Sequence, residues 1–159
     1  MSGERRRAAE GKIGVGTRVR VSRTFTASDL ARFGEITHDH NPVHYDPRWS
    51  AQKGYAQPVC HGLLVGSLLC EPGGQWGWLA SGMSFRFRAP VYPGDTVTCE
   101  LSIVEVDERQ RARAACVFTN QRDEVVLTAD LWGHLPCPEE QALLATMIAE
   151  GDPTNPLRD

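Results

Sequence analysis

The sequence lacks several features that mark special classes of protein. In its 159 residues, no apolar run approaches the roughly 18 residues of a membrane-spanning helix, and the first residues lack the apolar core of a secretory signal. Acidic residues outnumber basic ones by 20 to 17, for a net charge of −3, which gives no electrostatic basis for binding nucleic acid. We therefore expect a cytoplasmic protein that binds neither membranes nor nucleic acid.

The cysteines give no sign of covalent or metal cross-links. There are five, an odd number, and none forms a C-x-x-C pair, which argues against a disulfide framework and a structural zinc site. Free cysteine is among the most buried residue types, so we expect most of them in the core. With 41% apolar and 23% charged residues, the composition is that of an ordinary globular protein with one domain.

The first ordered segment is predicted to be a strand followed by a helix. Residues 17–25 alternate apolar and polar side chains, as a half-buried strand does. Thr26 is a good N-cap and Asp29 stands at the capping-box position. Leu30 and Phe33, with Ile36 as a further candidate, are expected on one face of the helix that follows.

A second, short helix is predicted after the first. Asp46 and Pro47 are typical of an N-cap and a first helical position, and the helix is expected to end at Gly54. Trp49 and Ala51 are expected to face inward.

A longer apolar segment, residues 62–70, has few polar positions on any side, so we expect a helix in the interior. Gly62 and Gly66 are four residues apart and permit close approach of a backbone or a ligand. Residues 71–77 are rich in glycine and contain a proline, which predicts a flexible loop and a truncated central helix.

The second half of the chain is predicted to form antiparallel strands joined by turns. Apolar and polar residues alternate over 83–88, 97–103, 112–119 and 125–135, with turn signals at 93–95, 107–110 and 120–123. Together with the early strand they predict an α+β fold in which one sheet is covered by the apolar helix.

The ends of the chain are expected to lie outside this domain. Residues 1–12 are charged without periodicity and predict a disordered arm. One domain over 13–136 follows, then an extension over 137–159 with a possible short helix at 139–150 and a tail.

Polar residues crowd into one stretch, 37–46, which holds three histidines and two aspartates. Asn41 and Pro42 break regular structure, so Asp39 and His44 lie on two limbs of a turn where their side chains can converge. Such a cluster is costly to bury unless it is paired or used. Its functional interpretation is an acid/base pair, and the alternative is a polar loop with Asx-type turns.

Three motifs occur in order along the chain. They are T-x-D-x-N-P-V-H-x-D at 37–46, H-G-L-L at 61–64 and F-x-A-P-V-x-x-G-D at 87–95. From about Val15 to Pro136 the chain resembles the MaoC-like dehydratases and (R)-specific enoyl-CoA hydratases of the hotdog superfamily. The resemblance implies a hotdog fold, with a curved antiparallel sheet wrapped around a central apolar helix. It also implies a homodimer or dimer of dimers that needs no cofactor.

The resemblance also implies the chemistry. Asp39 and His44 match the family's catalytic pair, which adds water reversibly to an enoyl thioester of CoA or acyl carrier protein, giving an (R)-3-hydroxyacyl product. Gly62, at a helix start, is expected to donate its N–H to the thioester oxygen. Asn41 is expected to shape the turn, and His61 to contact the thioester arm or support the helix.

Three more residues are candidates for substrate binding. Cys70 lies on the helical face of Gly62, where relatives place a small polar residue near the thioester. Trp76 and Trp78 are expected to wall the acyl pocket, and the alternative is that both are core or dimer-interface residues. Arg86 and Arg88 are possible contacts for CoA phosphates, or else solvated strand residues.

No metal site is expected at His38 and His40, because they flank Asp39 on opposite sides of an extended segment and have no partner at ligand spacing. Two other functions stay open. The same site could add an amine to an enoyl thioester or hydrolyse the thioester, since a fold does not determine the chemistry. The other is that the chain is a non-catalytic subunit of a heterodimer. The retained acid/base pair argues against this hypothesis.

Overall fold

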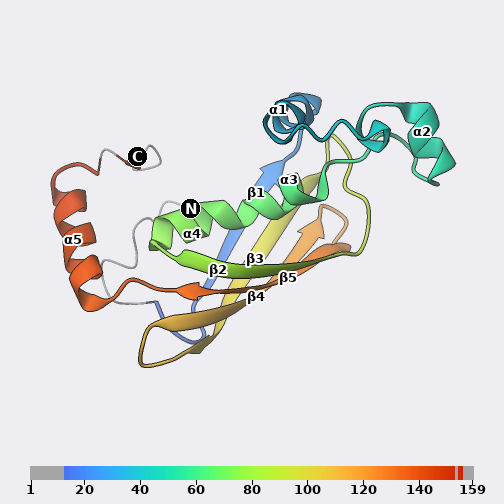
Figure 1. The fold of residues 1–159 in the computed structure, drawn as a ribbon. Coiled ribbons are helices and arrows are strands. Elements are labelled where there is room, and N and C mark those ends of the chain that lie inside the picture. The colour runs from blue at the N-terminus through green and yellow to red at the C-terminus, as the bar shows by residue number, and fades with distance from the viewer. Residues whose placement is uncertain (1–12, 153, 156–159) are drawn as a thin grey trace.

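A single antiparallel sheet dominates the fold. The computed structural model describes residues 13–152, 154 and 155, so the predicted N-terminal arm lies outside the described residues. The strands are β1 (Arg18–Thr24), β2 (Leu79–Phe87), β3 (Thr96–Val106), β4 (Arg111–Asn120) and β5 (Val125–His134). Their order across the sheet is β1-β3-β4-β5-β2 (Figure 1), so β1 and β2 are its two edges. The predicted strands and turns are confirmed.

The helices lie on one face of the sheet and beyond its ends (Figure 1). They are α1 (Ala27–Thr37), α2 (Pro47–Gln52), α3 (Gly62–Gly66), α4 (Cys70–Trp76) and α5 (Pro138–Ala149), with 3₁₀ turns η2 (Pro42–His44) and η3 (Ser67–Leu69). The consecutive segments α3, η3 and α4 run along the sheet, with α1 and α2 near one end of this run and α5 near the other.

The core lies between the sheet and this central helical run. Along β3, every second side chain from Val97 to Ile103 is buried, because successive residues of a strand point to opposite faces. Leu64, Val65 and Leu68 of the central run are also buried and belong to the same apolar cluster. Each such side chain contributes roughly 1.5–3 kcal/mol by leaving water.

Both predicted helix starts are confirmed. The Asp29 N–H donates to Thr26 Oγ1 and the Thr26 N–H donates to Asp29 Oδ2, which completes a capping box. The Asp46 carboxylate accepts from the Arg48 N–H at 2.8 Å at the start of α2. These side chains satisfy backbone donors that have no partner inside a helix.

The prediction that Trp49 and Ala51 of α2 face inward is wrong. Trp49 is 47% exposed and Ala51 is also exposed. Ser50 is buried instead, and its hydroxyl donates to the Val43 carbonyl at 2.9 Å. The hydrogen bond explains the inversion, because a buried hydroxyl with a partner costs little.

The predicted loop over residues 71–77 is also wrong, whereas a central helix shorter than that of relatives stays a prediction. A helix continues from Cys70 to Trp76 and ends at Gly77, whose φ is +65°. Pro72 lies in the first turn of α4, after the 3₁₀ turn η3, where its missing N–H is tolerated. Trp76 is completely buried at the far end and anchors the helix to the core.

The predicted C-terminal helix is confirmed as α5. Beyond it, the Asn155 and Gln75 side-chain amides form two reciprocal hydrogen bonds, at 3.0 and 3.1 Å, and both residues are buried. The division into a domain and an extension stays a prediction. None of the helices in the described part of the chain is both long and apolar enough to span a bilayer, and the cytoplasmic location stays a prediction.

Candidate active site

The polar stretch forms a tight turn between α1 and α2. Helix α1 ends at His38 in the left-handed conformation. The Asn41 N–H then donates to Asp39 Oδ1 and the Val43 N–H donates to Asn41 Oδ1, each at 3.2 Å. The predicted Asx turns therefore exist, and they direct the chain so that His44 returns toward Asp39.

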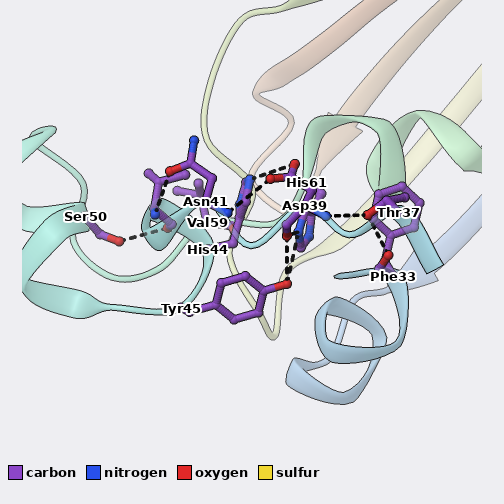
Figure 2. Close-up of polar contacts among 10 residues, drawn as sticks. Phe33, Thr37, Asp39, Asn41, His44, Tyr45, Ser50, Val59 and His61 are labelled. Carbon is purple, nitrogen blue, oxygen red and sulfur yellow. Dashed lines mark hydrogen bonds and ion pairs between the residues drawn. The ribbon is translucent and has the colours of Figure 1, made fainter. Parts of the chain in front are cut away.

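Asp39 and His44 come together as predicted (Figure 2). The His44 Nε2 atom lies 3.7 Å from Asp39 Oδ2, and the two side chains are 11% and 47% exposed. His44 Nδ1 lies 2.8 Å from the Val59 carbonyl oxygen. Since a carbonyl oxygen only accepts, Nδ1 must carry the proton, which leaves a lone pair on Nε2 of the neutral ring. The site thus presents a basic nitrogen and a carboxylate to one bound molecule.

A buried histidine and a tyrosine hold the backbone of this pair (Figure 2). The Asp39 carbonyl oxygen accepts from the Tyr45 hydroxyl at 3.1 Å and from His61 Nε2 at 3.2 Å. The His61 ring is 2% exposed and stacks on His44, with ring centroids 3.8 Å apart. Burial is the main reason why the pKa of His61 is lowered, so this ring favours its neutral form.

Tyr45 is a member of the site that the sequence analysis missed. Its hydroxyl packs so closely against α1 that a Cβ at Gly34 would collide with it. Burial, followed by the charges of Asp39 and Glu35, raises the pKa of Tyr45, so the hydroxyl keeps its proton and remains a donor. The contact crosses the turn between α1 and η2, and the residues immediately beside Tyr45 hold no signal for it.

The pair opens onto a cavity of about 760 Å³, within the usual range for ligand pockets. Its polar lining comes from Thr37, Asp39, His44, Tyr55, His61 and Arg88. Its apolar lining includes Phe33, Val43, Val59, Cys60, Leu63, Val65, Phe87, Val91, Val126 and Leu127. A ligand with one polar end and an apolar chain matches this division.

Gly62 also lines the cavity, at the first position of α3. Its N–H makes no hydrogen bond within the described part of the chain, as expected for the first residue of a helix. A Cβ at this position would lie 2.5 Å from the Phe87 ring. The close approach of that ring therefore requires glycine.

The other predicted site residues lie elsewhere. Asn41 is exposed and shapes the turn. Cys70 is exposed and does not line the cavity, because it lies eight residues, about 12 Å, along the helical run from Gly62. Trp76 and Trp78 are buried core residues, which is the alternative considered for them. The structure does not bring these last three to the cavity.

One group of side chains could hold a metal ion. Asp39, His44 and His61 each offer a potential ligand atom, and these atoms lie within 4.8 Å of one another. His38 and His40 are exposed and do not belong to this group. The hydrogen bonds to carbonyl oxygens place the lone pair of His44 on Nε2 and that of His61 on its buried Nδ1. The absence of a metal stays a prediction.

The antiparallel sheet and its central helical run define a hotdog-fold protein, with the Asp39–His44 pair beside an apolar cavity. A family profile described as MaoC like domain matches residues 8–125. The chain belongs to the MaoC-like domain family, and the predicted resemblance is confirmed.

Individual relatives agree with this assignment. The 3-hydroxybutyryl-CoA dehydratase of Methylorubrum extorquens is 33% identical over 140 residues, covering 82% of this chain and 86% of the relative. The (R)-specific enoyl-CoA hydratase of Aeromonas caviae is 36% identical over 98 residues, covering 59% of this chain and 73% of the relative. A solved structure of the (R)-hydratase from A. caviae involved in PHA biosynthesis superimposes with a TM-score of 0.73 at 31% identity. The superposition covers 79% of this chain and 98% of that structure. The hotdog fold is therefore confirmed.

Proposed function

We propose that this chain is a hydro-lyase that interconverts an enoyl thioester and water with an (R)-3-hydroxyacyl thioester, on CoA or acyl carrier protein. One observation carries the proposal: Asp39 Oδ2 and His44 Nε2 lie 3.7 Å apart, and both residues line the cavity. The similarity to proteins named as enoyl-CoA hydratase and 3-hydroxybutyryl-CoA dehydratase supports it.

In the proposed reaction, a water molecule binds between Asp39 and His44. His44 Nε2 takes a proton from this water as the oxygen forms a bond to the β-carbon of the enoyl group. The electron pair of the double bond moves toward the thioester carbonyl. Asp39 orients the water and stabilises the imidazolium that forms. A proton transfer by a positioned side chain, such as the one to His44, typically raises the reaction rate about 10²- to 10⁴-fold.

Gly62 is proposed to stabilise the charge on the thioester oxygen. Its N–H lies at a helix start, where unpaired donors and the helix dipole favour negative charge. When the carbonyl re-forms, the α-carbon takes the proton held by the Asp39–His44 pair. Hydrogen and hydroxyl then reach the same face of the double bond.

We further propose that the chain forms a homodimer through the edge strand β2. Within the described part of the chain this strand pairs with β5 alone, and its apolar side chains Met83 and Phe87 are 47% and 57% exposed. Leu63, beside Gly62, is 58% exposed. An unpaired apolar edge is a liability in a monomer, and a second copy would cover it. Light scattering on wild type and Met83→Glu tests this proposal, with a monomeric wild type as the contrary result.

The test of the activity uses crotonyl-CoA and purified chain. We expect the absorbance of the conjugated enoyl thioester to fall until hydration reaches equilibrium, and chiral analysis to find the (R) product. A thiol reagent added in parallel measures free CoA and separates hydration from hydrolysis. An unchanged absorbance over a panel of enoyl thioesters, from short to long, would contradict the proposal.

A further inference from the structure

The face of the buried His61 ring lies against the ring of His44. The planes of the two rings are 24° from parallel and their centroids are 3.8 Å apart. Phe33 also packs on His61, with centroids 5.2 Å apart and planes at 57°. Because His61 is only 2% exposed, protein groups rather than water surround this ring.

The surroundings of His61 keep its ring neutral. Its Nε2 lies 3.2 Å from the Asp39 carbonyl oxygen and carries the ring proton, because a carbonyl oxygen only accepts. Its Nδ1 is buried and finds no hydrogen-bond partner among the described residues. A second proton on Nδ1 would create a charged ring whose buried N–H has no acceptor, which is costly. Burial lowers the pKa of His61 accordingly.

His44 is the ring that becomes charged in the proposed reaction. Its Nδ1 donates to the Val59 carbonyl at 2.8 Å, and its Nε2 lies 3.7 Å from Asp39 Oδ2. An acceptor therefore lies near each nitrogen of the imidazolium. The His44 side chain is 11% exposed, so water has little access to the faces of the ring. His61 covers a face instead.

A neutral aromatic ring attracts a cation that lies over its face. The π-electrons give the face a partial negative charge, and the attraction is stronger where the contact excludes water. A charged His61 would have the opposite effect, because two like charges in close contact disfavour each other. Support of a charged His44 therefore requires that His61 stays neutral.

We propose that His61 is a positioning residue that stabilises the imidazolium of His44 with the face of its neutral ring. The inference rests on the proposed function, because the proposed reaction places a proton on His44 Nε2. The stabilisation is present only while His44 is charged, which is at and near the transition state. It therefore raises kcat rather than the affinity for substrate.

The other titratable groups around His44 act in different ways. Asp39 lies at the edge of the His44 ring, beside Nε2. Tyr45 meets the ring edge-on, with planes at 88° and centroids 6.3 Å apart, and its hydroxyl donates to the Asp39 carbonyl. His40 is exposed and contacts Tyr45. Among the described ring contacts of His44, the one with His61 alone is stacked face to face.

The experiment compares His61→Phe with analogues in which the new ring carries one, two or three fluorine atoms. These rings have nearly the same shape, and none has an N–H, so Tyr45 remains as donor to the Asp39 carbonyl in each variant. Every fluorine withdraws electrons and weakens the negative charge of the face. We expect kcat for crotonyl-CoA hydration to fall stepwise, about tenfold over the whole series, with KM unchanged.

The same series at His134 is the matched control. His134 is exposed at the end of β5 and does not line the cavity, so kcat should stay at the wild-type value. A constant kcat across the series at position 61, or a change in KM alone, would overturn the inference. Urea unfolding should give equal free energies across the series, which distinguishes a weaker ring face from a loss of folded protein.

Nitrogen-15 NMR of the wild-type protein tests the distribution of charge without turnover. As the pH is lowered on the folded protein, we expect His61 to keep the signals of a neutral ring with its proton on Nε2 after His44 has become doubly protonated. Protonation of His61 first, or of both rings together, would overturn the inference. A wild-type protein that is inert toward enoyl thioesters would refute the proposed hydration, and the NMR result would still decide which ring is charged.

Discussion

The imidazole rings of His44 and His61 are stacked, with centroids 3.8 Å apart and planes 24° from parallel. His61 also contacts the carbonyl oxygen of Asp39 through Nε2. One buried ring therefore positions both members of the proposed acid/base pair, although they lie on different limbs of the turn. Substitutions of these residues and of their neighbours should distinguish residues that take part in the reaction from residues that position them.

Loss of either member of the pair should abolish most of the activity. For Asp39→Asn and His44→Ala we expect kcat for crotonyl-CoA hydration to fall by about 10²- to 10⁴-fold. His38→Asn is the control, because His38 is exposed in the same stretch and asparagine tolerates its left-handed conformation. An Asp39→Asn enzyme with wild-type kcat would refute the assigned role.

Tyr45→Phe should lower kcat by about three- to tenfold, because one of the two donors to the Asp39 carbonyl is lost while His61 remains. KM should change little, since Tyr45 does not line the cavity. Steady-state kinetics separate the two constants. Tyr92→Phe should behave as wild type, because among the described residues the Tyr92 hydroxyl hydrogen-bonds with the Ala56 N–H alone, at 3.4 Å. A change in KM alone would argue against a positioning role.

Two glycines of the central helical run should respond in opposite directions. Gly62→Ala places a Cβ 2.5 Å from the Phe87 ring, so we expect a loss of about 1–3 kcal/mol in the free energy of unfolding together with a loss of activity. Gly73→Ala meets no atom within 4 Å and should raise that free energy by about 0.4–1 kcal/mol. Urea unfolding measures both. A destabilised Gly73→Ala would contradict the helix observed there.

Acid should destabilise the chain through His61. Burial lowers the pKa of the folded ring below its ordinary value of 6.5, so the unfolded chain binds the proton first as the pH falls. The contribution of His61 is complete above pH 6.5 and decreases below it. Urea unfolding over this range should show a smaller pH dependence in His61→Gln than in wild type, whereas exposed His134→Gln should keep the wild-type slope. Identical slopes in all three proteins would exclude the effect.

Thiol labelling should distinguish the cysteines. Cys70 is exposed, whereas Cys60 is buried in the cavity wall. Burial, with the charges of Asp95 and Asp29, raises the pKa of Cys60 to about 12, and the thiolate is the reactive form. A short pulse of iodoacetamide, read by mass spectrometry, should label Cys70 and spare Cys60 until urea is added. Rapid labelling of Cys60 in the folded protein would count against this placement.

The sequence predicts local features whose causes are local. The caps at Thr26 and Asp46 depend on residues two or three positions away, and the strands follow from a period of two. The turn around Asn41 likewise follows from its own side chain. These predictions succeed because neighbouring residues supply all the partners involved.

The errors arise where contacts beyond the nearest neighbours, several of them across a turn, decide the outcome. Pro72 and the glycines that follow it predict a loop. The segment is nevertheless helical, because Trp76 is buried and a 3₁₀ turn precedes the helix. Trp49 reads as an anchor, yet a hydrogen bond to Val43 turns Ser50 inward. Tyr45 reaches the site only by folding back onto α1. None of these contacts has a signature in the adjacent sequence.

The reciprocal amide pair of Gln75 and Asn155 has a practical consequence for anyone who shortens this chain. Removing residues 150–159 would leave the buried amide of Gln75 without the hydrogen bonds to Asn155. We expect the free energy of unfolding to fall by about 1–3 kcal/mol. The destabilised residue lies in α4, which continues the helical run that begins at Gly62. Trimming the C-terminal residues would therefore also perturb the far end of the helical run that carries Gly62.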